Sequence, residues 1–295
     1  MNQLVLLSPA KLNFFLKVIR KRPDGYHDIL TLFERINLCD EIYFESDSPG
    51  ITKVFCAHQD VPKGSQNIVY RAASLLRTEL GVKKGVRIYI NKRIPVAAGL
   101  AGGSSNAATV LLGLNKMWNL DLSPHQLISF GRKVGSDVPF FLADTSWAIG
   151  RQRGDRIISL RFPASLWHIL VVPRKKVFTP KVYQGFDELL FKRGGQRNIL
   201  TKKGDDVNIL IRRLRNNNIK EAGELLFNDL EPAILRFCPS LGRLKERLKS
   251  LQIQGVTISG SGPAIFGLTE SEDEAESIKT ILARQFQQVF VVKTF

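Results

Sequence analysis

Residues 94–108 read IPVAAGLAGGSSNAA, and this stretch decides how the rest of the chain is interpreted. An alternating segment typical of a strand, residues 87–91, precedes it, and an apolar segment that predicts a helix to about Met117 follows it. A glycine loop that opens a helix lets backbone N–H groups approach a phosphate, and the helix N-terminus adds partial positive charge. The loop is neither a Walker A loop nor a GxGxxG fingerprint. Alone, it is equally compatible with a flexible turn before a core helix.

Two other segments strengthen the phosphate interpretation. Residues 8–13 read SPAKLN and place Lys11 in a mostly apolar strand, where an unpaired ammonium is costly to bury, so we expect it to have a partner. Residues 259–263 read SGSGP and join two predicted strands. This turn either offers further N–H groups to an anion or is simply a tight hairpin.

Patterning along the chain predicts an α+β protein. Strands are expected at residues 4–7, 11–19, 29–38, 41–45, 51–56, 87–91 and 168–172. Helices are expected from 67 to a cap at Gly81, from Ser123-Pro124 to about 134, and around 181–190, 205–215 and 220–227. A final unit of helix 241–251, strand 256–259, strand 264–268, helix 271–285 and strand 289–293 resembles half of a ferredoxin-like fold.

Composition indicates a globular protein that attracts anions. The chain has 295 residues, 44% hydrophobic and 24% charged, and 43 Lys and Arg against 27 Asp and Glu give a net charge of +16. Residues 161–220 hold 14 of these cations against 4 acids, so this segment is either a polyanion-binding face or a solvated one. We expect a domain boundary here, between residues 162 and 163.

Other features point to a cytoplasmic protein. Cys39, Cys56 and Cys238 form no CxxC pair, which suits a reducing compartment. The uncharged run 94–115 is long enough to span a bilayer but contains Pro95 and several glycines, so we reject it as a membrane helix. No secretory signal, transit peptide or lipidation motif is visible, and we expect no membrane partner.

PAKLN, PxxxGLxGGSSNAA and SGSGP, in this order, resemble the three motifs of the GHMP kinase superfamily of small-molecule kinases. Residues 23–27, PDGYH, and 135–141, GSDVPFF, resemble the branch that phosphorylates an alcohol on a substrate carrying a cytidine diphosphate. The resemblance extends from Ser8 to about Gly267. It implies an ATP-binding domain like domain 2 of ribosomal protein S5 (1–162), a ferredoxin-like substrate-binding domain (163–295), and an active site between them.

The resemblance also implies a reaction. ATP would phosphorylate the 2-hydroxyl of a cytidyl-linked methylerythritol in the non-mevalonate route to isoprenoid precursors. Asp137 would be the catalytic base and Lys11 its electrostatic partner, since a carboxylate near an alcohol can accept its proton while a cation keeps that carboxylate ionised. Taken alone, Asp137 reads as a turn residue after Gly135.

The resemblance assigns the cytosine to an aromatic pocket. Tyr26 would stack on the base, His27 would hydrogen-bond its edge, and Tyr183 would form the second wall. Asn13 and Thr179 match polar positions that contact the substrate. Each residue has a simpler alternative, because Tyr26 and His27 can pack in a turn and Tyr183 can lie on the apolar face of a helix.

For ATP, the resemblance assigns the phosphates to the glycine loop and the adenine side of the pocket to Asn67 and Lys92. The alternatives are a helix cap for Asn67 and a solvated strand end for Lys92. Mg²⁺ would be held mainly by the ATP phosphates, so no dedicated metal cage is expected. The loop residues are Pro95, Val96, Ala97, Ala98, Gly99, Leu100, Ala101, Gly102, Gly103, Ser104 and Ser105.

Two details of the loop remain open from the sequence. Ser104 and Ser105 either cap the helix or reach phosphate or Mg²⁺ with their hydroxyls. Ala97, Ala98 and Ala101 stand where other members have glycine, and alanine keeps the N–H donor. Phosphate binding is therefore in doubt only if one of these positions needs a left-handed backbone.

Two rival functions remain. Another kinase of the superfamily, acting on homoserine or mevalonate, would keep the glycine loop but give Tyr26 and His27 no purpose. A nucleic-acid-binding protein would explain the charge of residues 161–220, although we expect no specific nucleic-acid partner. His58, His125 and His168 have no second ligand at useful spacing and are expected to be structural. The sequence does not predict an oligomeric state.

Overall fold

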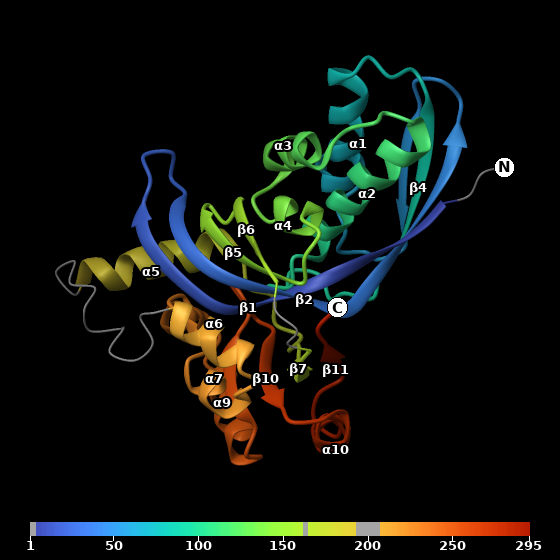
Figure 1. Cartoon of the computed structure of the whole chain (residues 1–295). Coiled ribbons are helices and arrows are strands. Elements are labelled where there is room, and N and C mark those ends of the chain that lie inside the picture. The colour runs from blue at the N-terminus through green and yellow to red at the C-terminus, as the bar shows by residue number, and fades with distance from the viewer. Residues whose placement is uncertain (1–3, 162–164, 193–206) are drawn as a thin grey trace.

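The computed structural model describes residues 4–161, 165–192 and 207–295, which form two sheets with helices (Figure 1). The larger sheet has the strand order β3-β4-β2-β1-β8, with β5 paired to β2 and β6 paired to β5. Its strands are β1 (Leu4–Lys21), β2 (His27–Asp47), β3 (Thr52–Cys56), β4 (Gly85–Asn91), β5 (Trp147–Gln152), β6 (Arg156–Leu160) and β8 (Phe227–Asn228). The smaller sheet has the order β11-β7-β10-β9, with β7 (Trp167–Val171), β9 (Gln254–Ile258), β10 (Ile265–Thr269) and β11 (Val289–Lys293).

Strands β1 and β2 form one long antiparallel hairpin, whose pairing runs from Leu4↔Phe44 to Lys21↔His27. The prediction of four separate strands over this region is wrong. Register shifts in β1 occur after Pro9, Asn13 and Val18, and the pairing continues past each of them. The sequence pattern therefore contained breaks where the backbone continues.

Four helices pack against the larger sheet, on one side of the β1–β2 hairpin in Figure 1. They are α1 (Ile68–Glu79), α2 (Gly102–Trp118), α3 (Pro124–Val134) and α4 (Val138–Leu142), with a single 3-10 turn at Gly64–Gln66. Leu111 of α2, Leu76 of α1 and Phe44 of β2 lie in one buried cluster. The predicted starts of α1 and α3 are confirmed, because Asn67 and Ser123 accept hydrogen bonds from the first turns of these helices.

The second half of the chain surrounds the smaller sheet. Its helices are α5 (Thr179–Lys192), α6 (Val207–Arg215), α7 (Ile219–Glu224), α8 (Glu231–Phe237), α9 (Ser240–Ser250) and α10 (Glu272–Leu282). The predicted final unit of helices and strands over 241–293 is confirmed, with ends that differ by a few residues. The predicted helix at 205–215 begins at Val207 within the described part, and the proposed boundary at 162/163 lies outside the described residues.

Sequence analysis missed the helices α4 and α8 and the strands β5, β6 and β8. Helices α4 and α8 are each two turns or shorter and carry proline near their start, so they show too little periodicity to detect. Strand β5 contains Gly150, which reads as a strand breaker. A Cβ at Gly150 would lie 2.5 Å from the Phe33 ring, so glycine is needed here for close packing and does not interrupt the strand.

Backbone pairing and a shared core join the first and second halves of the chain. Strand β8 pairs in parallel with the middle of β1, at Phe15↔Phe227 and Leu16↔Asn228. Phe14 of β1 packs edge-on against Trp147 at 4.8 Å and contacts Phe266 of β10 at 5.3 Å between ring centroids. Strand β1 therefore passes between both halves of the molecule. No helix in the described residues has the length and apolar character that crossing a bilayer requires.

Gly113 sets how closely α2 approaches the sheet, and hence where the N-terminus of α2 lies. A Cβ at this position would lie 2.4 Å from the Phe44 ring. We expect Gly113→Ala to lower the free energy of unfolding by about 1–3 kcal/mol through overpacking, as measured by urea denaturation. Gly242→Ala in α9 is the matched control, because its Cβ would make ordinary contact at 3.9 Å, and it should leave stability unchanged or slightly raised. Equal midpoints for the two variants would contradict this account.

Candidate active site

A cavity of about 930 Å³ lies between the β1–β2 hairpin, the glycine loop, α5 and the 259–263 turn. Of the residues predicted to form the site, all but Leu100 and Ser105 line it. Leu100 is buried and supplies its carbonyl oxygen to the backbone N–H of Lys11, at 3.1 Å. Ser105 is also buried, and the Ser8 hydroxyl donates to its Oγ at 2.8 Å. These two residues therefore support the cavity from behind.

The three predicted motifs meet at one point. The backbone N–H of Asn13 donates to Ser259 Oγ at 3.2 Å, and that hydroxyl donates to the carbonyl oxygen of Gly99 at 3.1 Å. A Cβ at Gly99 would lie 2.2 Å from the carbonyl oxygen of Ser259, and Gly99 has a φ of 82°. Only glycine fits this approach and this backbone, so the loop and the turn are built to touch.

The glycine loop contains two alanines with left-handed backbone, Ala97 at φ 56° and Ala101 at φ 54°. The expectation that alanine here needs only negative φ is therefore wrong at two of the three positions. A left-handed backbone costs an alanine about 1–2 kcal/mol. The N–H donors remain, and Gly102, Gly103 and Ser104 line the cavity at the first turn of α2.

The N-terminus of α2 is available to an anion. Ala101 is its N-cap residue and offers no side-chain hydrogen bond, so the idea that Ser104 or Ser105 caps this helix is wrong. Uncapped N–H groups at the start of a 17-residue helix carry partial positive charge. This end of the cavity is therefore suited to phosphate.

A buried carboxylate that sequence analysis missed holds the loop from below. Asp40 of β2 is fully buried and accepts four hydrogen bonds through its two oxygens. Oδ1 accepts from the backbone N–H groups of Arg93 and Ile94, at 2.7 and 2.8 Å, and Oδ2 accepts from Asn106 Nδ2 at 2.8 Å and from Lys92 Nζ. Lys92 is thus a buried ion-pair partner, and its interpretation as a solvated strand end is wrong.

Asn67 lines the cavity, but both atoms of its amide already have partners. Oδ1 accepts from the N–H of Val69 at 2.8 Å, and Nδ2 donates to the carbonyl oxygen of Pro62 at 2.8 Å. The structure bears out the alternative interpretation of Asn67 as a helix cap. Its contribution to the cavity is to position the start of α1.

Lys11 and Asp137 interact electrostatically across the cavity wall. Lys11 is buried, its Nζ donates to Asn13 Oδ1, and it lies 5.6 Å from the centroid of the Phe33 ring. Burial lowers the pKa of Lys11, and the negative charge of Asp137 partly offsets this effect. Among the described residues, no ion pair within 4.0 Å joins the two. Asp137 immediately precedes α4 and lines the cavity, and no cation in the described part of the chain forms an ion pair with it.

The far end of the cavity is aromatic, and Tyr26, His27 and Tyr183 all line it. His27 stacks on Tyr183, with 4.8 Å between ring centroids and 25° between planes. Tyr26 is 56% exposed and carries the guanidinium of Arg153 over its ring at 5.3 Å. Burial, assisted by the charge of Asp137, raises the pKa of Tyr183, which places Asp137 near this end as well.

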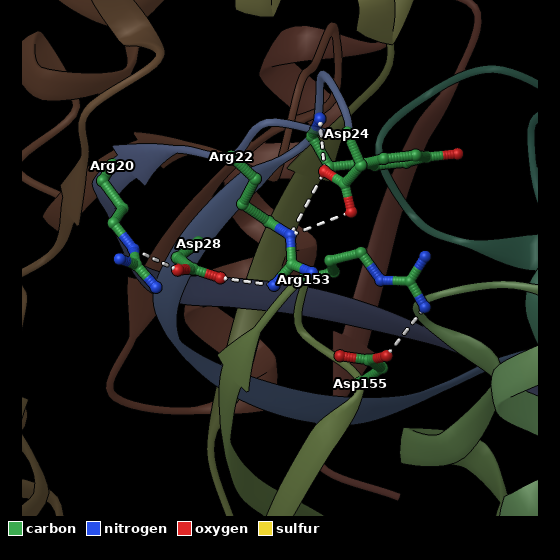
Figure 2. Close-up of polar contacts among 7 residues, drawn as sticks. Arg20, Arg22, Asp24, Asp28, Arg153 and Asp155 are labelled. Atoms are coloured by element: carbon green, nitrogen blue, oxygen red, sulfur yellow. Dashed lines mark hydrogen bonds and ion pairs between the residues drawn. The ribbon is translucent and has the colours of Figure 1, made fainter.

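Ion pairs order the turn that presents Tyr26 (Figure 2). Arg22 bridges Asp24, at 3.1 Å, and Asp28, at 3.0 Å, while Arg20 binds the other oxygen of Asp28. Hydrogen bonds from Arg20 and then Arg22 lower the pKa of Asp28. Arg153, the cation beside Tyr26, is itself held by Asp155 at 3.0 Å and lines the cavity, a contribution that sequence analysis missed.

Asp187 is the second acid that sequence analysis missed. Its Oδ1 lies 2.8 Å from His27 Nε2, and its Oδ2 accepts from Lys21 Nζ at 2.8 Å. Burial opposes ionisation of this carboxyl, but hydrogen bonds from Lys21 and His27 outweigh burial and lower the pKa of Asp187. A signal existed in the sequence, because Thr179, Tyr183 and Asp187 recur every four residues and so share one face of α5.

The start of α5 meets the 259–263 turn at the cavity, where Thr179 Oγ1 lies 2.7 Å from Ser261 Oγ.

Within the described part of the chain, no group of three or more His, Cys, Asp or Glu side chains could hold a metal ion. His168 is buried and pairs with Glu34 at 2.9 Å, which agrees with its structural interpretation. Cys39, Cys56 and Cys238 are free thiols.

Comparison with known proteins supports the motif analysis. The family model "GHMP kinases N terminal domain" matches residues 67–144, and "GHMP kinases C terminal" matches residues 210–288. The chain is 42% identical over 285 residues to a 4-diphosphocytidyl-2-C-methyl-D-erythritol kinase of Citrifermentans bemidjiense, covering 96% of each sequence. It is 37% identical over 290 residues to the enzyme of that name from Exiguobacterium sibiricum, covering 98% of this chain and 97% of the relative.

A solved structure agrees with these relatives. A crystal structure of 4-(cytidine 5'-diphospho)-2C-methyl-D-erythritol kinase superposes with a TM-score of 0.81 at 32% identity. The match covers 99% of this chain and 100% of that one. The likeness therefore includes both sheets and the cavity between their loops.

The buried pair of Asp40 and Lys92 should be a major source of stability. Asp40→Asn keeps the shape but leaves the Lys92 ammonium buried without a counter-charge, so unfolding free energy should fall by about 3 kcal/mol. Glu41→Gln is the matched control, because this neighbour on β2 pairs with Arg93 at the surface and should cost less than about 1 kcal/mol. Urea denaturation measures both, and a similar small loss in both variants would show that Asp40 is not the anchor.

The left-handed backbone at Ala101 predicts a stabilising substitution. Ala101→Gly should raise the unfolding free energy by about 1 kcal/mol, because glycine adopts this backbone without strain. Ala98→Gly in the same loop is the control and should not stabilise, since Ala98 has no positive φ and its buried methyl group would be lost. Thermal midpoints of the two variants check this, and an Ala101→Gly midpoint at or below that of the parent would argue against strain at this residue.

Proposed function

Because this chain belongs to the 4-diphosphocytidyl-2-C-methyl-D-erythritol kinase family of GHMP kinases, we propose that it transfers the γ-phosphate of ATP to the 2-hydroxyl of 4-diphosphocytidyl-2-C-methyl-D-erythritol. Membership makes the chain an ATP-dependent small-molecule kinase of isoprenoid precursor synthesis. The observation that carries the choice of substrate is a single cavity that combines an uncapped helix N-terminus with the stacked rings of His27 and Tyr183.

We assign the triphosphate of ATP to the first turn of α2 and the loop before it. Backbone N–H groups there stabilise negative charge, and the left-handed residues curve the chain so that these groups converge. Asp40 and Lys92 fix this backbone from below, so the donors are in place before the nucleotide arrives. We place Asn67 and Lys92 in the cavity wall near the adenine. Their polar atoms form hydrogen bonds to protein groups, so they shape this wall and do not bind the base directly.

We assign proton transfer to Asp137. Its carboxylate accepts the proton of the 2-hydroxyl as that oxygen forms a bond to the γ-phosphorus and the bond from phosphorus to the ADP oxygen breaks. The Lys11 ammonium, which interacts electrostatically with Asp137, balances negative charge that accumulates on the transferring group. Asn13 holds that ammonium through its Oδ1 and is fixed in turn by a hydrogen bond from its Nδ2 to Thr31, at 2.7 Å.

Mg²⁺ fits this site as a partner of the phosphates. The described residues offer no acidic cage, whereas the Ser104 hydroxyl lines the cavity at the start of α2, beside the N–H groups assigned to phosphate. Bound Mg²⁺ would neutralise phosphate charge. Ser104 would be its protein ligand, with phosphate oxygens and water supplying the others.

The aromatic end is assigned to the cytosine. Tyr26 offers an exposed ring to stack on the base, and His27, held on Tyr183, offers a ring nitrogen to the base edge. Thr179 and Asn13 contribute polar contacts to the rest of the substrate. We further propose a reducing, cytoplasmic location, in which the three free thiols remain reduced, and no specific nucleic-acid partner.

Removal of the Asp137 carboxylate tests the mechanism. Asp137→Asn keeps the side-chain shape but cannot accept a proton, so kcat should fall by about 10²–10⁴-fold while KM changes little. Release of ADP is measured with ATP and Mg²⁺ and with the cytidyl substrate, mevalonate and homoserine offered separately. Asp273→Asn, an exposed acid on α10, is the control and should retain full activity.

The wild-type protein should turn over only the cytidyl substrate. Turnover of mevalonate or homoserine instead would replace the proposed substrate with another of the superfamily. Turnover of none of the three would leave the glycine loop as a binding site and would favour polyanion binding. Full activity in Asp137→Asn would overturn the assignment of the base.

A further inference from the structure

We infer that Asp187 is a specificity-determining positioning residue, which acts through His27 to select cytosine over uracil. The inference rests on the proposed function, because it concerns the base of the substrate assigned above. Asp187 lies on α5 and lines the cavity, and the chemistry assigned so far gives it no direct task. Its contacts with Lys21 of β1 and His27 of β2 indicate what its role is.

Strand register brings two hairpin residues to Asp187. Lys21 and His27 are direct cross-strand partners at the end of the β1–β2 pairing, so their side chains share one face of the hairpin. Both reach the same carboxylate, Lys21 Nζ at Oδ2 and His27 Nε2 at Oδ1, each at 2.8 Å. One turn earlier on α5, Tyr183 stacks on the imidazole at 4.8 Å. The plane and the orientation of the His27 ring are therefore fixed from two sides by one helix.

The same contacts fix the proton on the ring. An ionised carboxylate only accepts hydrogen bonds, so Nε2 must carry the proton that binds Asp187. Lys21 binds the other oxygen of the same carboxylate, so an ion pair lies directly beside the imidazole. With its proton on Nε2, the neutral tautomer presents a lone pair at Nδ1, and the only hydrogen bond of this ring found among the described residues is the one at Nε2.

A lone pair at Nδ1 distinguishes the two pyrimidines. Cytosine carries an amino group at position 4, which donates a hydrogen bond, whereas uracil carries a carbonyl oxygen there, which can only accept one. In this tautomer, His27 Nδ1 accepts a hydrogen bond from the cytosine amino group. Opposite uracil, Nδ1 faces a carbonyl oxygen, and both atoms are acceptors that remain unpaired. Asp187 thus sets specificity without touching the base.

Kinetics with paired substrates test the inference. Asp187→Asn can donate its amide N–H to Nε2, which moves the ring proton to Nδ1 and reverses the polarity offered to the base. KM for the cytidyl substrate should rise about tenfold and the preference in kcat/KM over the uridyl analogue should fall about tenfold, while kcat stays within about twofold. Glu188→Gln is the matched control, because this neighbour on α5 is half-exposed, pairs with Arg236 and should change neither quantity.

Dependence on His27 separates positioning from a merely structural role. In a His27→Gln background, Asp187→Asn should change the cytidyl preference by less than about twofold, because the two residues act as one unit. A full additional loss in that background would overturn the inference. Unchanged KM and preference in Asp187→Asn itself would also overturn it. If the wild-type protein turns over no cytidyl substrate, the proposed function fails and this inference fails with it.

The proton on His27 can also be observed directly. Nitrogen-15 NMR of histidine-labelled protein should show His27 protonated at Nε2 in the wild type, and at Nδ1 in Asp187→Asn. This readout does not require turnover. A wild-type ring protonated at Nδ1 would overturn the inference even if the kinetics changed as expected.

Discussion

A single buried carboxylate, that of Asp40, holds together the segments on which the cavity depends. It joins β2 to the backbone at residues 93–94 where the glycine loop begins, to Lys92, and to Asn106 in α2. Asn106 extends the network to Ser8 in β1, and Ser8 reaches Ser105. A buried charge is tolerated only when its hydrogen-bonding capacity is filled. All four donors must therefore lie within hydrogen-bond distance of Asp40. This requirement fixes the backbone of the loop.

Close backbone contact extends this constraint to the other sheet. Gly99 and Ser259 approach each other more closely than any side chain would allow, and Ser259 also accepts from Asn13. The loop, β1 and the 259–263 turn are thus positioned by one another. The phosphate end of the cavity is held by contacts that involve the backbone. The base end is formed by the hairpin turn and α5, which contact each other through side chains.

Sequence reasoning succeeded where the signal is local. Helices with caps, such as those begun by Asn67 and Ser123, were predicted, and the three motifs identified the superfamily and most of the residues that line the cavity. Failure came where distant segments decide the outcome. Asp40 and Asp187 have partners more than 50 and 150 residues away, so the sequence does not show what either carboxylate binds. The left-handed backbone of Ala97 and Ala101 could not be predicted either, because alanine rarely adopts it. Strand β1 is longer than predicted because its pairing continues through three register shifts.

The two-residue strand β8 limits how the molecule can move. Its backbone pairs with the middle of β1, while the side-chain amide of Asn228 donates to the carbonyl oxygens of Ile258 and Gly260, at 2.7 and 2.8 Å. A hinge opening between the two sheets would have to break these bonds together with the buried contacts of Phe14. The hairpin turn meets α5 through side chains instead, by the contacts of Asp187 with Lys21 and His27. Separating the two sheets thus requires breaking hydrogen bonds to the backbone, whereas separating the turn from α5 requires breaking side-chain contacts.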